Sequence, residues 1–314
     1  MWKTELKKNS EKKPEIRVAE TAGFCFGVDR AVNEVYRCLR EHPFKKICTY
    51  GPIVHNESVV AELTGLGVEI INDRAELERI LSQNKPDETV LIIRAHGISC
   101  KEKEYLESLK GLTVVDATCP YVSKIHETVR TAYGEGYRIL VTGDPGHPEV
   151  KGIVGCVGGD ATVISSPDDA EKFSCAPDTK LKLVSQTTFN LRKFEDIVEI
   201  FKIKLYDVSI VNTICNATQR RQAEAAELSR ECDVMIVIGG KDSSNTAKLY
   251  EICRSECQAT YYIQCLDDLS RVAIGSSVRC IGITAGASTP KTIIEEVLKY
   301  VRTEFWRYAC RGAY

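Results

Sequence analysis

The chain has 314 residues, which is more than one hydrophobic core usually organises and favours two or three domains. Hydrophobic residues make up 43% and charged residues 27%, so the composition is that of a folded globular protein and excludes a disordered chain. The formal net charge of -2 gives no excess of basic side chains for binding a nucleic-acid backbone or an anionic membrane surface. An anionic ligand would therefore have to be held by a local site.

Fourteen cysteines are many for a cytosolic chain, but they stay below the share of roughly 8–10% that marks disulfide scaffolds. The N-terminal extension, residues 1–15, mixes lysine with glutamate and has no apolar core, so it is not a secretory signal. No apolar run approaches the roughly 18–20 residues that span a bilayer. We therefore expect a cytoplasmic protein with no membrane or nucleic-acid partner, in which the cysteines are thiols.

A long internal repeat organises the sequence. Three apolar, β-branched segments are predicted as strands, and each runs into a cysteine within a few residues. The segments are residues 16–19, 113–116 and 209–212, and the cysteines are Cys25, Cys119 and Cys215. Helical periodicity follows each cysteine and predicts that a helix begins there. The three predicted helices cover residues 28–41, 121–135 and 218–231.

Two further strands are predicted in each repeat, and polar side chains follow both of them. The second strands are residues 46–50, 138–142 and 233–238, and the third are residues 89–93, 181–184 and 278–283. Strands that alternate with helices indicate βαβ units and parallel sheets, whose ligands bind beyond the carboxyl ends of the strands. The sequence therefore predicts the α/β class, with three pseudo-equivalent domains around a common centre, over residues 16–111, 112–208 and 209–288.

The three cysteines are candidate ligands of a soft metal, because a helix N-terminus lowers the pKa of a thiol. Three sulfurs fit either a zinc ion with an open position or a four-iron cluster with one iron free of protein, and the residues leave both open. A weaker alternative is a second metal site, formed by Cys253, Cys257 and Cys265 with Cys232 and Cys280 beside them. We expect the other cysteines to pack as small apolar side chains: Cys38, Cys48, Cys100, Cys156, Cys175 and Cys310.

The polar side chains after the strands are suited to an anion such as a diphosphate, because they are donors at loop-to-helix junctions. They are His55, His96, His147, Ser243, Ser244, Asn245 and Ser288. Glu149 has two interpretations: an acid that stabilises a helix N-terminus, or a proton donor for a departing hydroxyl group. Thr187, which follows a third strand, is placed to relay or orient that proton.

These candidate residues lie in nine short motifs. The motifs are GFCFGVDRA (23–31), GPIVHN (51–56), RAHG (94–97), DATCP (116–120), GHPE (146–149), SQTT (185–188), TIC (213–215), SSN (243–245) and TAGAS (284–288). In this order they resemble the 4-hydroxy-3-methylbut-2-enyl diphosphate reductase family, over roughly residues 16–290. One small departure is Thr21-Ala22, where many members of the family have a proline.

The resemblance implies a trefoil of three α/β domains around a 4Fe-4S cluster. It assigns Cys25, Cys119 and Cys215 to three of the irons and leaves the fourth iron open to substrate. It further implies that the C-terminal tail, residues 289–314 with Trp306 and Tyr308, packs back on the first domain.

The resemblance also implies a reaction. The seven polar donors would hold the diphosphate, and Thr187 would also bind the substrate, beside its reacting hydroxyl group. Glu149, Thr187 and His147 would act in catalysis, with Glu149 as the proton donor. The substrate would lose its allylic hydroxyl group as water after two-electron reduction, which gives isopentenyl and dimethylallyl diphosphates. This is the last step of the non-mevalonate isoprenoid pathway, for which ferredoxin or flavodoxin would donate the electrons.

Two other classes of protein stay open. Quinolinate synthases and the diphthamide-forming enzymes have a similar plan, in which three repeats each offer one cysteine to a cluster. Their chemistry does not account for donors such as His55, Ser243 and Asn245. A cluster-bearing redox sensor, which is not an enzyme, would need the cysteines but neither Glu149 nor Thr187.

Overall fold

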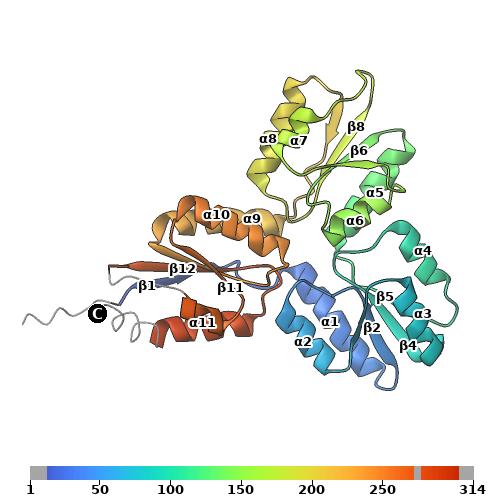
Figure 1. The fold of residues 1–314 in the computed structure, drawn as a ribbon, viewed down its shortest axis with the longest axis horizontal. Coiled ribbons are helices and arrows are strands. Elements are labelled where there is room, and N and C mark those ends of the chain that lie inside the picture. Colours follow the sequence, from blue (N-terminus) through green and yellow to red (C-terminus); the bar gives the residue numbers. More distant parts are fainter. Residues whose placement is uncertain (1–12, 272–276, 304–314) are drawn as a thin grey trace, which may run out of the picture.

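The computed structural model describes residues 13–271 and 277–303. Three four-stranded sheets form three lobes around a common centre, and every strand pairing in them is parallel (Figure 1). Apolar residues cover both faces of each sheet, which is the usual state of a parallel sheet with helices on both sides. The predicted α/β class and the trefoil arrangement are therefore confirmed.

The first lobe contains a sheet with helices on both faces. Its elements are α1 (Phe26–Glu41), β2 (Lys46–Tyr50), α2 (Glu57–Gly65), β3 (Glu69–Ile71), α3 (Arg74–Gln83), the 3₁₀ helix η1 (Pro86–Glu88), β4 (Thr89–Ile93), α4 (Cys100–Ser108) and β5 (Thr113–Asp116), and the strand order is β3-β2-β4-β5. Side chains alternate along β4: Val90 and Ile92 pack toward α1 and α2, while Leu91 and Ile93 pack toward α3 and α4. This central strand is fully buried.

The second lobe repeats this plan. Its elements are α5 (Pro120–Gly134), β6 (Arg138–Thr142), α6 (Pro148–Gly155), β7 (Ala161–Ile164), α7 (Pro167–Lys172), β8 (Leu181–Ser185), α8 (Leu191–Ile203) and β9 (Val208–Ile210), in the strand order β7-β6-β8-β9. Ile139 and Val141 pack against α5 and α6, whereas Leu140 faces α7 and α8 on the other side.

The third lobe combines the two ends of the described chain. Its elements are β1 (Glu15–Val18), α9 (Asn216–Glu231), β10 (Val234–Ile238), α10 (Ser244–Glu256), β11 (Thr260–Ile263), the 3₁₀ helix η2 (Leu266–Arg271), β12 (Cys280–Ala285) and α11 (Lys291–Thr303), in the strand order β1-β12-β10-β11. Met235 and Val237 face α9 and α10, and Val234 and Ile236 face α11.

The strand before each cysteine belongs to a different lobe from the helix that follows that cysteine. β5 pairs with β4, β9 pairs with β8, and β1 pairs with β12 near the other end of the chain. The expected boundary at residues 111–112 separates β5 from its partner β4, and the boundary at residues 208–209 runs through β9, which pairs with β8. The pairing instead gives these strands to the first and second lobes, so each cysteine lies where the chain crosses between lobes.

The C-terminal helix packs elsewhere than expected. Within the described residues, α11 places Ile293, Val297 and Val301 in one apolar core with Val234 and Ile281 of the third sheet. This helix covers the third sheet, so residues 289–303 meet the expected first domain only at its start, where Ile16, Val18 and Ala22 pack against the same core. Trp306 and Tyr308 lie outside the described residues.

A disulfide joins the first and second lobes. Cys100 begins α4 and Cys156 follows α6, and their Cα atoms are 4.7 Å apart. The expectation that both are packed thiols is wrong. The two helix ends approach closely because residue 155 is glycine, since a Cβ there would collide with the side chain of Ser99. Of the other cysteines expected to pack, Cys38 and Cys48 are free and buried, Cys175 is free and partly exposed, and Cys310 lies outside the described residues.

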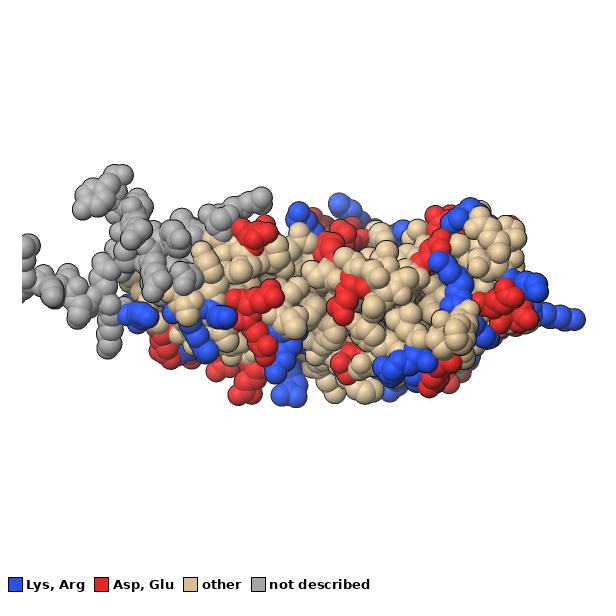
Figure 2. Space-filling model, turned by 90° about the horizontal axis from the view of Figure 1, so that it is seen from below, with Lys and Arg blue, Asp and Glu red and all other residues tan. Residues whose placement is uncertain are grey.

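Charge is mixed over the surface. Figure 2 shows basic and acidic side chains interspersed on one face, with no large area of a single sign on that face. In the part of the chain that the structure describes, no helix combines the length and the apolar character needed to cross a bilayer.

We expect reduction of the Cys100–Cys156 disulfide to lower the free energy of unfolding by roughly 2–4 kcal/mol, because the bond closes a loop of 56 residues in the unfolded chain. Chemical denaturation with and without a thiol reductant measures the difference. The double variant Cys100→Ser/Cys156→Ser should be insensitive to the reductant. Equal stability of the wild-type protein under both conditions would contradict the pairing.

Candidate active site

Three helices begin at the three cysteines, as the sequence predicts. Cys25, Cys119 and Cys215 are the N-cap residues of α1, α5 and α9. The backbone N–H of each cysteine donates to a carbonyl in the loop that follows a buried strand of the preceding sheet. These bonds are Cys25 N to Ala287 O (3.1 Å), Cys119 N to Ala95 O (2.9 Å) and Cys215 N to Thr187 O (3.2 Å).

One central cavity brings the predicted residues together. All twelve candidate residues line it, from all three lobes: Cys25, His55, His96, Cys119, His147, Glu149, Thr187, Cys215, Ser243, Ser244, Asn245 and Ser288. The first turn of α1 contacts the Cys119 sulfur so closely that a Cβ at Gly27 would collide with it. Strand ends that are distant in the sequence therefore meet at a single site.

Burial dominates the electrostatics of the thiols. It raises the pKa of Cys119 to about 11 and also raises the pKa of Cys215, although Thr218 donates to the Cys215 sulfur from its backbone N–H (3.4 Å). The expectation that the helix N-terminus lowers these pKa values is therefore wrong for the metal-free chain, because desolvation penalises the thiolate. A bound metal would displace the thiol proton directly.

The spacing of the three sulfurs distinguishes the two kinds of metal centre. Sulfurs bound to one zinc ion at about 2.3 Å lie at most about 4.6 Å from each other. Among the described residues, three histidines form a group whose possible ligand atoms all lie within 4.8 Å of one another. The three cysteines do not form such a compact group. In the metal-free chain the three sulfurs are therefore spread more widely than the ligands of one zinc ion would be.

The second group of cysteines does not assemble a metal site in the described residues. Cys232, Cys253, Cys257 and Cys280 are packed in an apolar cluster between β10 and the helices α9 and α10. The sulfurs of Cys232 and Cys280 are 3.1 Å apart, but no third donor atom completes a compact set with them. These four cysteines therefore pack as small apolar side chains in this cluster.

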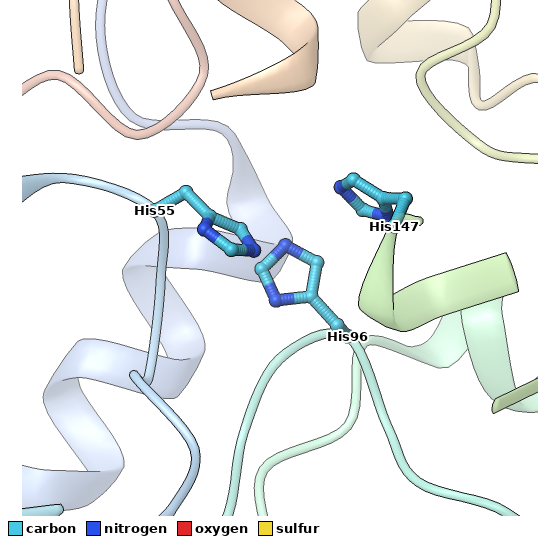
Figure 3. Close-up of side chains that lie close together, drawn as sticks. All are labelled: His55, His96 and His147. Carbon is cyan, nitrogen blue, oxygen red and sulfur yellow. The ribbon is translucent and has the colours of Figure 1, made fainter. Parts of the chain in front are cut away.

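Three histidines that line the cavity form a compact cluster (Figure 3). The ring centroids of His55 and His96 are 4.6 Å apart, those of His96 and His147 are 5.2 Å apart, and those of His55 and His147 are 5.6 Å apart. Nε2 of His55 and Nδ1 of His96 are buried without a hydrogen-bond partner. Buried polar atoms usually have partners, so these two nitrogens indicate a ligand. The donor set could hold a metal ion or the oxygens of an anion.

The histidines are neutral in the ligand-free chain at neutral pH. Burial lowers the pKa of His55, lowers that of His96 well below its ordinary value, and lowers that of His147 to about 4. Nδ1 of His147 accepts the Glu149 N–H (3.2 Å), so the neutral ring carries its proton on Nε2 and can donate it to a ligand. The partly buried cation Arg94 also lowers the pKa of all three rings.

Glu149 is a buried carboxyl group rather than a solvated helix cap. It is 2% exposed, and its two oxygens accept the backbone N–H (2.6 Å) and the hydroxyl (2.7 Å) of Thr187. Burial raises its pKa to about 7 against the opposing effect of these bonds. A carboxyl group with this pKa holds and releases a proton near neutrality, as a general acid must.

The third lobe contributes neutral donors to the same cavity. Ser243 is the N-cap residue of α10, and the Ser288 hydroxyl donates to the His55 carbonyl (2.9 Å). Asn245 accepts the Ala287 N–H (2.9 Å) through Oδ1, which leaves its buried Nδ2 without a partner. An amide nitrogen in this state is a further donor for an anion.

The sequence analysis missed three residues that support the site. Arg94 precedes His96 by two residues, and its Nε donates to the Gly97 carbonyl at 3.5 Å. Gln186 and Thr188 flank Thr187 and connect the second lobe to Ser244 of the third, at 3.3 and 3.2 Å. These residues lie inside the motifs RAHG and SQTT, and their place in the motifs could have indicated that they belong to the site.

The fold and the cavity define a class: a three-lobed α/β protein in which a thiol-lined centre adjoins a cluster of donors for an anion. The model of the LytB protein family matches residues 16–302, and the chain belongs to this family. A 4-hydroxy-3-methylbut-2-enyl diphosphate reductase from Caldanaerobacter subterraneus subsp. tengcongensis is 44% identical over 290 residues, which are 92% of this chain and 97% of that protein. The enzyme of the same name from Clostridium perfringens is 41% identical, over 91% of this chain and 98% of the relative.

Solved structures agree with this assignment. The structure of the E-1-hydroxy-2-methyl-but-2-enyl-4-diphosphate reductase from Plasmodium falciparum matches with a TM-score of 0.85 and 30% identity, over 93% of this chain and 89% of that one. A second structure, titled as the terminal enzyme of the non-mevalonate pathway, matches with a TM-score of 0.63 and 38% identity, over 92% and 99% of the two chains. The chain is thus an oxidoreductase of the LytB family.

We expect the ligand-free protein to lose stability as the pH falls from about 6.5 toward 4. The unfolded chain protonates its histidines near pH 6.5, whereas burial delays protonation of His147 in the folded chain until about pH 4. Denaturant titrations across this range should give a slope that His147→Gln reduces by about 1 kcal/mol per pH unit. The control His42→Gln, at the end of α1, should keep the wild-type slope. An unchanged slope in His147→Gln would contradict the burial effect.

Proposed function

We propose that the protein reduces (E)-4-hydroxy-3-methylbut-2-enyl diphosphate by two electrons, with loss of the hydroxyl group as water, to isopentenyl and dimethylallyl diphosphates. This is the terminal reaction of the non-mevalonate pathway, and the named relatives support it. The observation that carries the proposal is the cavity itself. It joins three cysteines from three repeats, unpartnered donors and one buried, protonatable carboxyl group.

Cys25, Cys119 and Cys215 would hold a 4Fe-4S cluster. When bound, such a cluster supplies electrons and an iron with Lewis acidity that no protein side chain occupies. The chain offers three thiols at this centre, and their spacing exceeds that of a single zinc site. Three ligands with no spare cysteine in the cavity lining support a cluster with one iron free of protein.

The diphosphate would occupy the histidine side of the cavity. His55, His96 and His147 can donate from neutral rings, and Ser243, Ser244, Asn245 and Ser288 add neutral donors from the third lobe. The histidine group alone would also suit a zinc ion. Serine and asparagine donors beside it favour an anion, because hydroxyl and amide groups are rare zinc ligands.

Glu149 would deliver the proton that converts the departing hydroxyl group to water. Its carboxyl group is close to half protonated at neutral pH, and Thr187 fixes its orientation through two hydrogen bonds. The bonds from Thr187 also connect the carboxyl group to the loop that holds Cys215, through the Cys215 N–H. The acid is therefore positioned relative to one of the cluster ligands.

This arrangement favours the reductase over the two alternative classes. An enzyme of the quinolinate synthase or diphthamide type would leave the donors His55, Ser243 and Asn245 without a role. A redox sensor would have no use for a buried Glu149–Thr187 pair. We further propose that ferredoxin or flavodoxin donates the electrons and that the reaction takes place in the cytoplasm, as the resemblance to the reductases implies.

Each of Cys25→Ser, Cys119→Ser and Cys215→Ser should abolish the brown chromophore of anaerobically purified protein, because three ligands leave none to spare. Iron and acid-labile sulfide analysis measures the loss. Cys175→Ser changes a free, partly exposed cysteine outside the cavity and should keep full cluster content. A cluster that survives in all three ligand variants would refute the assignment.

Glu149→Gln should keep the cluster and bind substrate, but lower kcat by roughly 10²–10⁴-fold, because it removes only the transferable proton. The wild-type kcat should fall as the pH rises through about 7, since the acid must be protonated. The matched control is Asp168→Asn, an exposed acid that also follows a proline at the start of a helix. Near-normal turnover of Glu149→Gln would return Glu149 to a structural role.

A further inference from the structure

Arg221 interrupts the threefold repeat at the centre of the molecule. Six residues after its N-cap cysteine, α1 buries Ala31 and α5 buries Ile125, which are 0% and 1% exposed. At the same position α9 buries Arg221, which is 3% exposed. The third repeat thus places a permanent cation where the other two place an apolar side chain.

The guanidinium group contacts the two segments that flank the Cys25 turn. Nη1 donates to the Ala285 carbonyl at the end of β12 (2.7 Å), and Nη2 donates to the Gly23 carbonyl (2.9 Å). Nε is buried without a hydrogen-bond partner. Arg221 therefore fastens the chain just before Cys25 to α9, which begins at Cys215.

No carboxylate of the described residues forms a salt bridge with Arg221, although a buried cation without a countercharge is energetically costly. The nearby acid Glu224 instead accepts the backbone N–H groups of Glu20 (2.6 Å) and Thr21 (3.0 Å). Burial lowers the pKa of Arg221, and the groups that oppose this effect are Cys25, Cys215 and Glu224. Two of these three groups are the sulfurs at the centre.

We propose that Arg221 is the counter-cation of the metal centre, which stabilises the negative charge of the thiolates and of the electron that the centre takes up. The inference rests on the cluster of the proposed function. A cluster held by these residues would take up one electron from a reduced carrier, and that uptake would make or break no bond in the protein. A fixed positive charge held against the segments that flank the Cys25 turn would make that uptake easier, because net charge and hydrogen bonding set the potential of iron–sulfur centres. Arg221 is a positioning residue, since it binds the carbonyl groups of Gly23 and Ala285, which flank the Cys25 turn.

The test is a potentiometric titration of anaerobically purified protein, followed by the absorbance and electron paramagnetic resonance of the cluster. Arg221→Gln should shift the midpoint potential to a more negative value, such that the ratio of reduced to oxidised cluster at a fixed donor potential falls at least tenfold, or about 59 mV for one electron. Arg221→Lys keeps the charge and should stay closer to the wild type. The matched control is Arg220→Gln, the same change of charge one residue earlier at an exposed position of the same helix, which should leave the potential unchanged.

The outcomes separate this inference from the proposed function. A wild-type chain without iron and sulfide rejects the cluster, and the role of Arg221 with it. A wild-type chain with a cluster, and Arg221→Gln with the same cluster content and potential, rejects the counter-cation alone. If Arg221→Gln loses its cluster, the Arg221→Lys variant decides whether the positive charge is what matters. If Arg221→Lys keeps the wild-type cluster content and a midpoint potential close to that of the wild type, the role of the positive charge is supported. If Arg221→Lys loses the cluster although it keeps the charge, the counter-cation role is rejected.

Discussion

Three backbone hydrogen bonds at the centre hold the geometry on which the site depends. Each joins the N–H of a cysteine that begins a helix to a carbonyl in the loop of another strand end. Two of these carbonyls belong to Ala95 and Ala287, which directly precede His96 and Ser288, and the third belongs to Thr187 itself. The sulfurs and the polar donors are therefore positioned together. Breaking such a buried bond costs about 1–3 kcal/mol, so the lobes resist independent displacement at this point.

Burial then decides the charge of the centre. The same desolvation raises the pKa of Glu149 and Cys119 and lowers the pKa of the three histidines, so that all of these groups favour their neutral forms in the ligand-free chain. Arg94 and Arg221 keep their positive charge inside the structure. A cavity with neutral donors, near the buried Arg221 and the partly buried Arg94, is complementary to anions. A diphosphate and a cluster bound by three thiolates are both anionic.

Local pattern predicted most of the elements, and long-range contacts account for what it missed. The strand at residues 46–50 and the helix starts at Cys25, Cys119 and Cys215 follow from periodicity and are as predicted. The partner of β1 is β12, and a strand's pairing cannot be read from its own residues. The Cys100–Cys156 bond depends on how two helix ends meet across lobes. The pKa values of the Cys119 and Cys215 thiols are raised by burial in the folded chain, whereas the sequence argument considered only the helix dipole.

The central claim is that three sulfurs, one from each repeat, hold an iron–sulfur centre with one iron that no side chain binds. Mössbauer spectroscopy of protein grown with ⁵⁷Fe tests it most directly, because it resolves irons with different ligands. The account predicts one iron site that differs from the other three and that changes when the allylic diphosphate is added. Four equivalent irons that do not respond to the diphosphate, or a protein that binds zinc in place of iron, would contradict it.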